Sequence, residues 1–218
     1  MADIAALQLY QELARRGTRA DGGVATEFRA RIDRALPMLK RTLEAIARYF
    51  PHYTDHALTH SLRIVQNIGD VLLERRQFRR DRDEEVLSDL DLFLLIAAAL
   101  VHDIGMVVAE NELPTLRRDP DFRRHVEAWI AANRDDAVRD WWRDGVPRMA
   151  VADFIRARHP DRSLAFCLDQ HAPVMTNLTG GARGLAQLLG DIAAGHGMPF
   201  KQIKRSEEHT SELQSPCN

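Results

Sequence analysis

Apolar residues recur every three to four positions along almost the whole chain, and no segment shows a sustained alternation of apolar and polar residues. This periodicity is typical of amphipathic helices rather than strands. The expected helices span residues 4–16, 25–49, 87–101, 122–130, 148–158 and 182–194, and a further one begins at Thr54 or Asp55 and carries Leu58 to Leu72. Pro37 should kink or break the second of these helices. Asp119 and Pro120 should cap the helix at 122–130. The sequence therefore predicts an all-α protein.

One expected helix is apolar on every side. It contains the unbroken apolar run from Leu92 to Val101, and a helix of this kind lies at the centre of a fold. The run is shorter than the roughly 18 residues that span a bilayer. The N-terminus also lacks the charged-then-apolar order of a signal peptide. We therefore expect a cytoplasmic protein with no membrane association.

Two ionisable residues, His102 and Asp103, follow this apolar run directly. Such a pair is costly to bury unless something compensates its polarity or charge. A divalent cation would do so, because imidazole nitrogen and carboxylate oxygen are ligands for Mn²⁺, Fe²⁺ and Zn²⁺. The dipeptide also arises by chance in a chain with nine His, so the neighbouring motifs must support the interpretation.

Other histidines stand near expected helix ends. His56 and His60 are one helical turn apart on the same face, a spacing that can bind zinc. His159 precedes Pro160 at an expected helix end, and His196 lies between two glycines. Each also has a structural explanation: a solvated cap for His56, a hydrogen-bonded core histidine for His60, a plain helix cap for His159 and a loop residue after a helix for His196.

Four blocks in order, YTDHALTHSLRIV, LLIAAALVHDIGM, FIRARHPDRS and IAAGHG, resemble the HD superfamily of metal-dependent phosphohydrolases. The chain looks most like the HD domains found beside Hsp90-like ATPase modules. The resemblance implies a helical bundle with one or two divalent ions (Mn, Fe, Zn or Mg) at the ends of its central helices. The implied metal ligands are His60, His102, Asp103, His159 and His196, with His102 and Asp103 as the catalytic pair and Asp103 bridging the ions.

The implied reaction is cleavage of a phosphate ester by a metal-activated water, with a phosphorylated small molecule or nucleotide as substrate. His56, Arg156 and Arg162 are the candidate substrate-binding residues, because a guanidinium binds phosphate through two parallel hydrogen bonds. Surface solvation is the alternative for each arginine. The chain has 30 Lys+Arg against 32 Asp+Glu, and this balance argues against a nucleic-acid partner.

The chain departs from the family pattern at two places. Met106 stands where many members have a lysine after His-Asp-Ile-Gly. The closing aspartate of the family, on a helix after the last histidine, has no match. Asp191 is a poor substitute, because it lies five residues before His196 and five positions turn a side chain to the far side of a helix.

Residues 205–218 break the helical pattern. Their first part, RSEEHTSELQS, looks like the in-frame translation of a widely used sequencing adapter, so we expect an artefactual tail. The tail holds one Arg and three Glu, which leaves 29 basic and 29 acidic residues before it. The predicted organisation is an N-terminal helical region at 1–49 that packs on an HD-type domain at 50–204, truncated at its C-terminal end and followed in the full-length chain by an Hsp90-like ATPase domain.

A second hypothesis belongs to a different functional class. The chain would be a non-catalytic domain that senses a nucleotide or a metal and regulates the ATPase part of a larger protein. Fold and family alone do not decide between this role and hydrolysis.

Overall fold

The computed structural model describes residues 3–48, 50, 58–74, 87–109, 111–134, 145–169 and 171–197. Within these ranges the regular elements are helical and no strand occurs, so the prediction of an all-α fold is confirmed. Thr54, Asp55, His56 and the adapter-like segment 205–218 lie outside the described residues.

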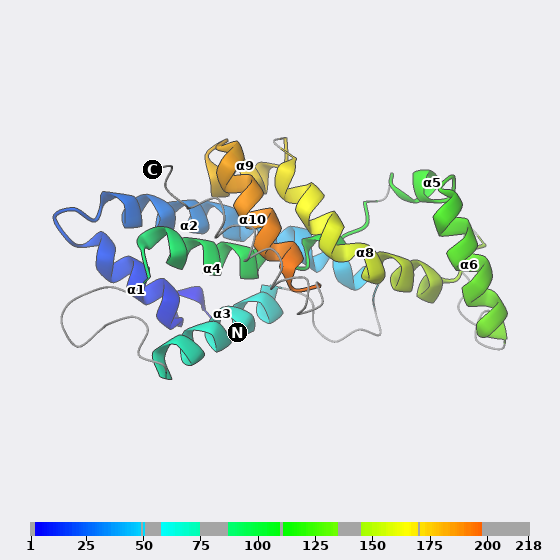
Figure 1. The fold of residues 1–218 in the computed structure, drawn as a ribbon, viewed down its shortest axis with the longest axis horizontal. Coiled ribbons are helices and arrows are strands. Elements are labelled where there is room, and N and C mark those ends of the chain that lie inside the picture. The colour runs from blue at the N-terminus through cyan, green and yellow to red at the C-terminus, as the bar shows by residue number, and fades with distance from the viewer. Residues whose placement is uncertain are drawn as a thin grey trace, which may run out of the picture.

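The helices are η1 (Ile4–Ala6), α1 (Gln8–Gly17), α2 (Gly23–Glu44), η2 (Ile46–Arg48), α3 (Leu58–Glu74), α4 (Asp89–Val101), η3 (Ile104–Met106), α5 (Leu113–Leu116), α6 (Pro120–Ala132), α8 (Arg148–Leu168), α9 (Pro173–Thr179) and α10 (Arg183–Gly195). Figure 1 shows α1 to α4 side by side, with α9 and α10 next to them. Among the described residues, none of the helices has the length and apolar character needed to cross a bilayer.

Helix α4 is the centre of this bundle, as its all-round apolar sequence predicts. It begins at a capping box, in which the Ser88 hydroxyl accepts from the Asp91 amide and the Asp91 carboxylate accepts from the Ser88 amide. The helix packs against α1, α2, α3 and α10. Its last turns, from Ile96 to Val101, are buried in the common core. The residues that follow α4, His102 and Asp103, therefore lie in the interior of the molecule.

Helix α8 differs from its prediction. The sequence predicted an end at 158, before the His159-Pro160 pair, whereas the helix continues through Pro160 to Leu168. The second half of α8 packs against α10 and η3, and this packing outweighs the helix-breaking tendency of proline. In Figure 1, α8 runs from α6 at one end of the molecule to α9 and α10. Pro37 likewise lies inside a helix, α2, which runs unbroken from Gly23 to Glu44.

A buried arginine ties α1 to the start of α4. Arg16 is 1% exposed; its Nε donates to Glu12 at 3.0 Å, and its Nη1 donates to the Leu87 carbonyl at 2.7 Å and to Asp89 at 3.1 Å. Hydrogen bonds from Arg15 and Arg16 lower the pKa of Glu12 from 4.5 to about 2. Helices α1 and α2 share one hydrophobic core with α3, α4, α8, α9 and α10.

This ion pair makes stability depend on pH. The folded-state pKa of Glu12 lies below its unfolded value, so its stabilising contribution is fully present above pH 4.5 and is lost as the pH falls toward 2. We expect Glu12→Gln to lower the free energy of unfolding by about 1 kcal/mol at neutral pH. The difference in unfolding free energy between Glu12→Gln and wild type should shrink as the pH falls. Urea unfolding of both proteins across this pH range measures the difference.

Glu27→Gln is the matched control, because Glu27 pairs with Arg31 on the exposed surface of α2 and its side chain is 51% exposed. It should change stability far less than Glu12→Gln does, because solvent screens an exposed pair. A loss for Glu12→Gln that is the same at acid and neutral pH would contradict the assigned role of the carboxylate.

Candidate metal centre

Asp103 lies at the centre of four histidines from four separate elements. Its Oδ2 atom is 3.0 Å from His102 Nε2 and 3.5 Å from His60 Nε2. Its Oδ1 atom is 3.5 Å from His159 Nε2, on α8. His196, at the end of α10, places its Nε2 atom 2.6 Å from that of His159. The structure thus brings together the five residues that the family resemblance singles out.

These residues form two groups with metal-binding geometry that share one carboxylate. Within each group the ligand atoms lie within 4.8 Å of one another; one group is His60, His102 and Asp103, and the other is Asp103, His159 and His196. Each carboxylate oxygen of Asp103 faces a different group. A carboxylate in this position is suited to bridging two cations.

Backbone carbonyls fix the orientation of three of the imidazole rings. The Nδ1 atom of His102 is 2.8 Å from the Ala99 carbonyl oxygen, and that of His159 is 2.6 Å from the Arg156 carbonyl oxygen. His196 Nδ1 has the same relation to Ala193. A carbonyl oxygen only accepts, so each Nδ1 carries the hydrogen. The lone pair of each neutral ring is therefore on Nε2, which points into the cluster.

The cluster has more acceptors than donors. The Nε2 lone pairs of His159 and His196 face each other at 2.6 Å, and that of His102 faces the Asp103 carboxylate at 3.0 Å. Acceptors this close repel unless a proton or a cation lies between them. The set of imidazole nitrogens and a shared carboxylate therefore fits a divalent metal.

The electrostatics of the two groups differ. Burial disfavours the charged form of His102, but its hydrogen bond to Asp103 and the charge of that carboxylate raise its pKa above the ordinary 6.5. For His196, burial and the neighbouring His159 and His102 lower the pKa. The Asp103 carboxylate therefore favours a positive charge beside it, at the position that a cation would occupy.

Burial gives the cluster an inner and an outer side. Asp103 and His102 are 5% and 8% exposed. The His60 side chain is 33% exposed, and His196 is also exposed. A ligand from solvent would therefore approach over His60 and His196, while the shared carboxylate stays inside.

The segment after Asp103, which contains η3 and is called the Asp103 loop below, lies in very close contact with α8. A Cβ atom on Gly105 would lie 2.2 Å from the His159 carbonyl oxygen and 2.6 Å from the Ser163 amide nitrogen, so only glycine fits. The fully buried Ser163 hydroxyl donates to the His102 carbonyl at 2.6 Å and accepts from the Gly105 amide at 3.0 Å. These contacts set the distance between Asp103 and His159. Nothing in the sequence pattern indicated Ser163.

The guanidinium of Arg162 is engaged with the same loop. It donates to the Gly105 carbonyl at 2.6 Å, to the Val107 carbonyl at 2.8 Å and to both oxygens of Glu112. These bonds favour a positioning role over the phosphate contact that the sequence predicted. Arg156, also predicted to bind substrate, is exposed and pairs with Asp153 at 3.1 Å. The substrate contacts of both arginines stay predictions.

Two residues that depart from the family pattern lie away from the cluster. Met106 is 1% exposed in the core, so this position presents no side chain to a substrate. Asp191 is exposed on α10 and accepts from Gln187 at 2.8 Å. We find it in neither group with metal-binding geometry among the described residues.

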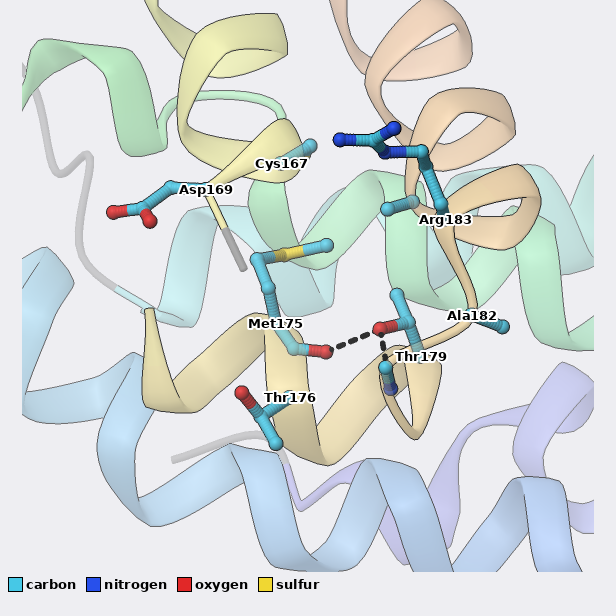
Figure 2. A pocket seen from close by; sticks show the side chains of 9 residues that line it. Cys167, Asp169, Met175, Thr176, Thr179, Ala182 and Arg183 are labelled. Carbon is cyan, nitrogen blue, oxygen red and sulfur yellow. Dashed lines mark hydrogen bonds between the residues drawn. The ribbon is translucent and has the colours of Figure 1, made fainter. Parts of the chain in front are cut away.

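Two cavities in the described part of the chain contain none of the candidate ligands of the cluster. A pocket of about 310 Å³ borders the loop and is lined by Ile104, Gly105, Val107, Ala109, Glu112, Arg162, Ala165 and Phe166. A second cavity, of about 10 Å³, lies between α8, α9 and α10 (Figure 2). There the Thr179 hydroxyl donates to the Met175 carbonyl at 2.8 Å. A cavity of this size holds a water molecule at most, so it is no substrate site.

The comparisons with known proteins give one match. A family model described as HD-CE matches residues 50–216, beyond the boundary at 204 that the sequence predicted for the domain. No curated protein and no solved structure matches the chain.

The close contact at Gly105 generates a prediction. Gly105→Ala should lower the free energy of unfolding by about 1–3 kcal/mol, because the added methyl group overlaps the α8 backbone. It should also weaken metal uptake, because His159 moves away from Asp103. Thermal unfolding and metal titration of the same preparation measure the two effects.

Gly184→Ala is the control, because a Cβ at this helical position on α10 meets no atom within 4 Å. It should leave metal uptake unchanged and stability equal or slightly higher. Unchanged metal affinity in a folded Gly105→Ala variant would show that the loop contact does not position the cluster.

Proposed function

Because this chain belongs to the HD-CE family, we propose that its HD-type domain is a metal-dependent phosphohydrolase. The observation that carries the proposal is Asp103, whose two oxygens face two separate groups of histidines at 3.0–3.5 Å. The family match and the candidate ligand groups support an HD-type metal centre. Hydrolysis of a phosphate ester is the further step that we propose.

The five candidate ligands would hold the ions in two groups. Asp103 would bridge two divalent ions, with His60 and His102 on one side and His159 and His196 on the other. Bound ions of this kind, Mn, Fe, Zn or Mg, lower the pKa of a coordinated water and polarise phosphoryl oxygens. The carbonyls that fix the imidazole rings keep the Nε2 lone pairs aimed at the centre.

The proposed substrate is a phosphorylated small molecule or a nucleotide. It would reach the centre over the exposed edges of His60 and His196, since the Asp103 side is closed by the core. We include in the proposal a cytoplasmic location and a downstream Hsp90-like ATPase domain in the full-length protein, both of which rest on the sequence alone.

A second function is favoured by a specific observation. Arg156 and Arg162, the two candidate phosphate-binding arginines, form ion pairs with Asp153 and Glu112. Guanidiniums engaged in this way weigh against a strong substrate-phosphate contact, so binding of a ligand such as a metal without phosphoester turnover is the second candidate. The alternative is a regulatory domain that senses a metal or a nucleotide for an attached ATPase.

Metal analysis and hydrolysis assays test the proposal. The wild-type chain should carry one or two equivalents of Mn, Fe, Zn or Mg, and Asp103→Asn should lose all of it because this residue belongs to both groups. Hydrolysis of an activated phosphodiester or of a nucleotide panel should fall to background in Asp103→Asn and after chelation. His171→Ala, a histidine outside both groups, is the control and should change neither readout.

The outcomes separate the two functions. A metal-loaded wild type that cleaves no phosphoester in the panel rejects the hydrolase and favours the sensor. A wild type that takes up none of these ions on titration rejects the metal centre itself.

A further inference from the structure

The pocket of about 310 Å³ between the Asp103 loop and α8 has no part in the proposed metal centre. It contains none of the five candidate metal ligands. Its volume is at the lower end of the range of about 300–1,000 Å³ in which proteins hold small molecules. A ligand that fits it is therefore a small molecule.

The lining of this pocket is mainly apolar. Five of its eight residues are Ile104, Val107, Ala109, Ala165 and Phe166. Val107 and Phe166 pack against the core and are partly buried, so they offer a fixed apolar surface that includes an aromatic ring. An aromatic body would gain free energy by leaving water for these walls.

The two charged residues of the lining, Arg162 and Glu112, neutralise each other. Both carboxylate oxygens of Glu112 accept from the guanidinium, so the pocket presents no unbalanced charge. A phosphate or carboxylate in the pocket would meet the Glu112 carboxylate. The lining therefore favours an uncharged ligand, in contrast to the phosphorylated substrate proposed for the metal centre.

Arg162 has one hydrogen left for such a ligand. A guanidinium has five N–H donors. The Nε atom of Arg162 donates to the Gly105 carbonyl, Nη2 to the Val107 carbonyl and to Glu112, and Nη1 to Glu112. Among the described residues, the second hydrogen of Nη1 has no acceptor, and the side chain is 24% exposed. A ligand with one carbonyl or hydroxyl oxygen can accept it.

The pocket and one group of metal ligands are built from the same two segments. Gly105 lies two residues after Asp103, and Arg162 lies one turn after His159 on α8. The Ser163 hydroxyl and Arg162 fasten the Asp103 loop to α8. If the loop leaves α8, the pocket loses one wall and Asp103 moves away from His159. Both sites therefore need the docked loop.

Two ligands that bind the same state of a protein strengthen each other. Here that state has the Asp103 loop docked on α8, and the competing state has it released. Local opening of this kind occurs in folded proteins, with a free energy that depends on the local contacts. Binding in the pocket and binding of an ion between the loop and α8 are therefore coupled positively.

We propose that this pocket binds a small, uncharged aromatic molecule with one oxygen acceptor, and that its occupation raises the affinity of Asp103, His159 and His196 for an ion. The second part rests on the proposed metal centre, whereas binding in the pocket does not. The pocket is thus an effector site of the domain, separate from the site of hydrolysis.

Binding is tested in the full, metal-free chain with PRODAN, an uncharged naphthalene dye with one carbonyl, whose emission moves to shorter wavelength in apolar surroundings. The wild type should bind one equivalent, and ¹⁵N NMR should show the Gly105 and Val107 amides shifting on titration. Ala165→Trp should abolish binding, because the indole fills the pocket. Ala131→Trp, on α6 and outside the lining, is the control and should bind like wild type. Both positions are exposed, so both variants should keep the wild-type thermal midpoint.

The coupling is tested by calorimetric titration with Mn²⁺, with and without saturating PRODAN. The affinity for one ion should rise about 5-fold or more, a size typical of coupling between two sites. Mn²⁺ should raise the affinity for the dye by the same factor. Ser163→Ala removes the hydroxyl that joins the loop to α8, so both affinities should fall and the coupling factor should grow.

Each part of the inference has results that overturn it. Absence of dye binding, binding that Ala165→Trp leaves intact, an equal loss in Ala131→Trp, or unmoved Gly105 and Val107 amides overturn the pocket. Equal Mn²⁺ affinities with and without bound dye overturn the coupling. A wild type that binds no ion rejects the metal centre and with it the coupling, whereas the metal-free dye titration still decides the pocket.

Discussion

The buried carboxylate of Asp103 is the constraint on which the rest of the structure depends. An isolated charge at 5% exposure is strongly unfavourable, so the fold must surround it with compensating groups. Four histidines do so, with three Nε2 atoms at 3.0–3.5 Å from its oxygens. Their positions in turn require α3, α8 and the end of α10 to converge where α4 stops.

The convergence is built mainly from backbone groups. Backbone carbonyls fix three imidazole rings. The absence of a side chain at Gly105 lets α8 approach the Asp103 loop, and Ser163 and Arg162 fasten the two together. The ligand nitrogens are therefore held by the same interactions that hold the helices, and a small shift of α8 changes the site as much as the core.

Much of the fold could be predicted from the sequence because helices are encoded locally. The apolar run from Leu92 to Val101 indicated a central helix, and α4 is that helix. The boundary of α8 could not be predicted in this way. Local propensity stops a helix before Pro160, whereas packing of α8 against α10 and η3 carries it on to Leu168. The short helix α9 (Pro173–Thr179) was not predicted at all.

The sequence by itself determined the helical class, the central apolar helix and the set of histidines and aspartate worth comparing with the HD pattern. Tertiary structure alone decided that these side chains meet, because residues 60, 103, 159 and 196 come close only when separate helices pack. It also decided that Arg162 serves the Asp103 loop and that Ser163 joins α8 to it. Hydrogen bonds between distant segments produce no periodic pattern in a sequence. For this physical reason the sequence indicated the helices, and only the tertiary structure showed the contacts between them.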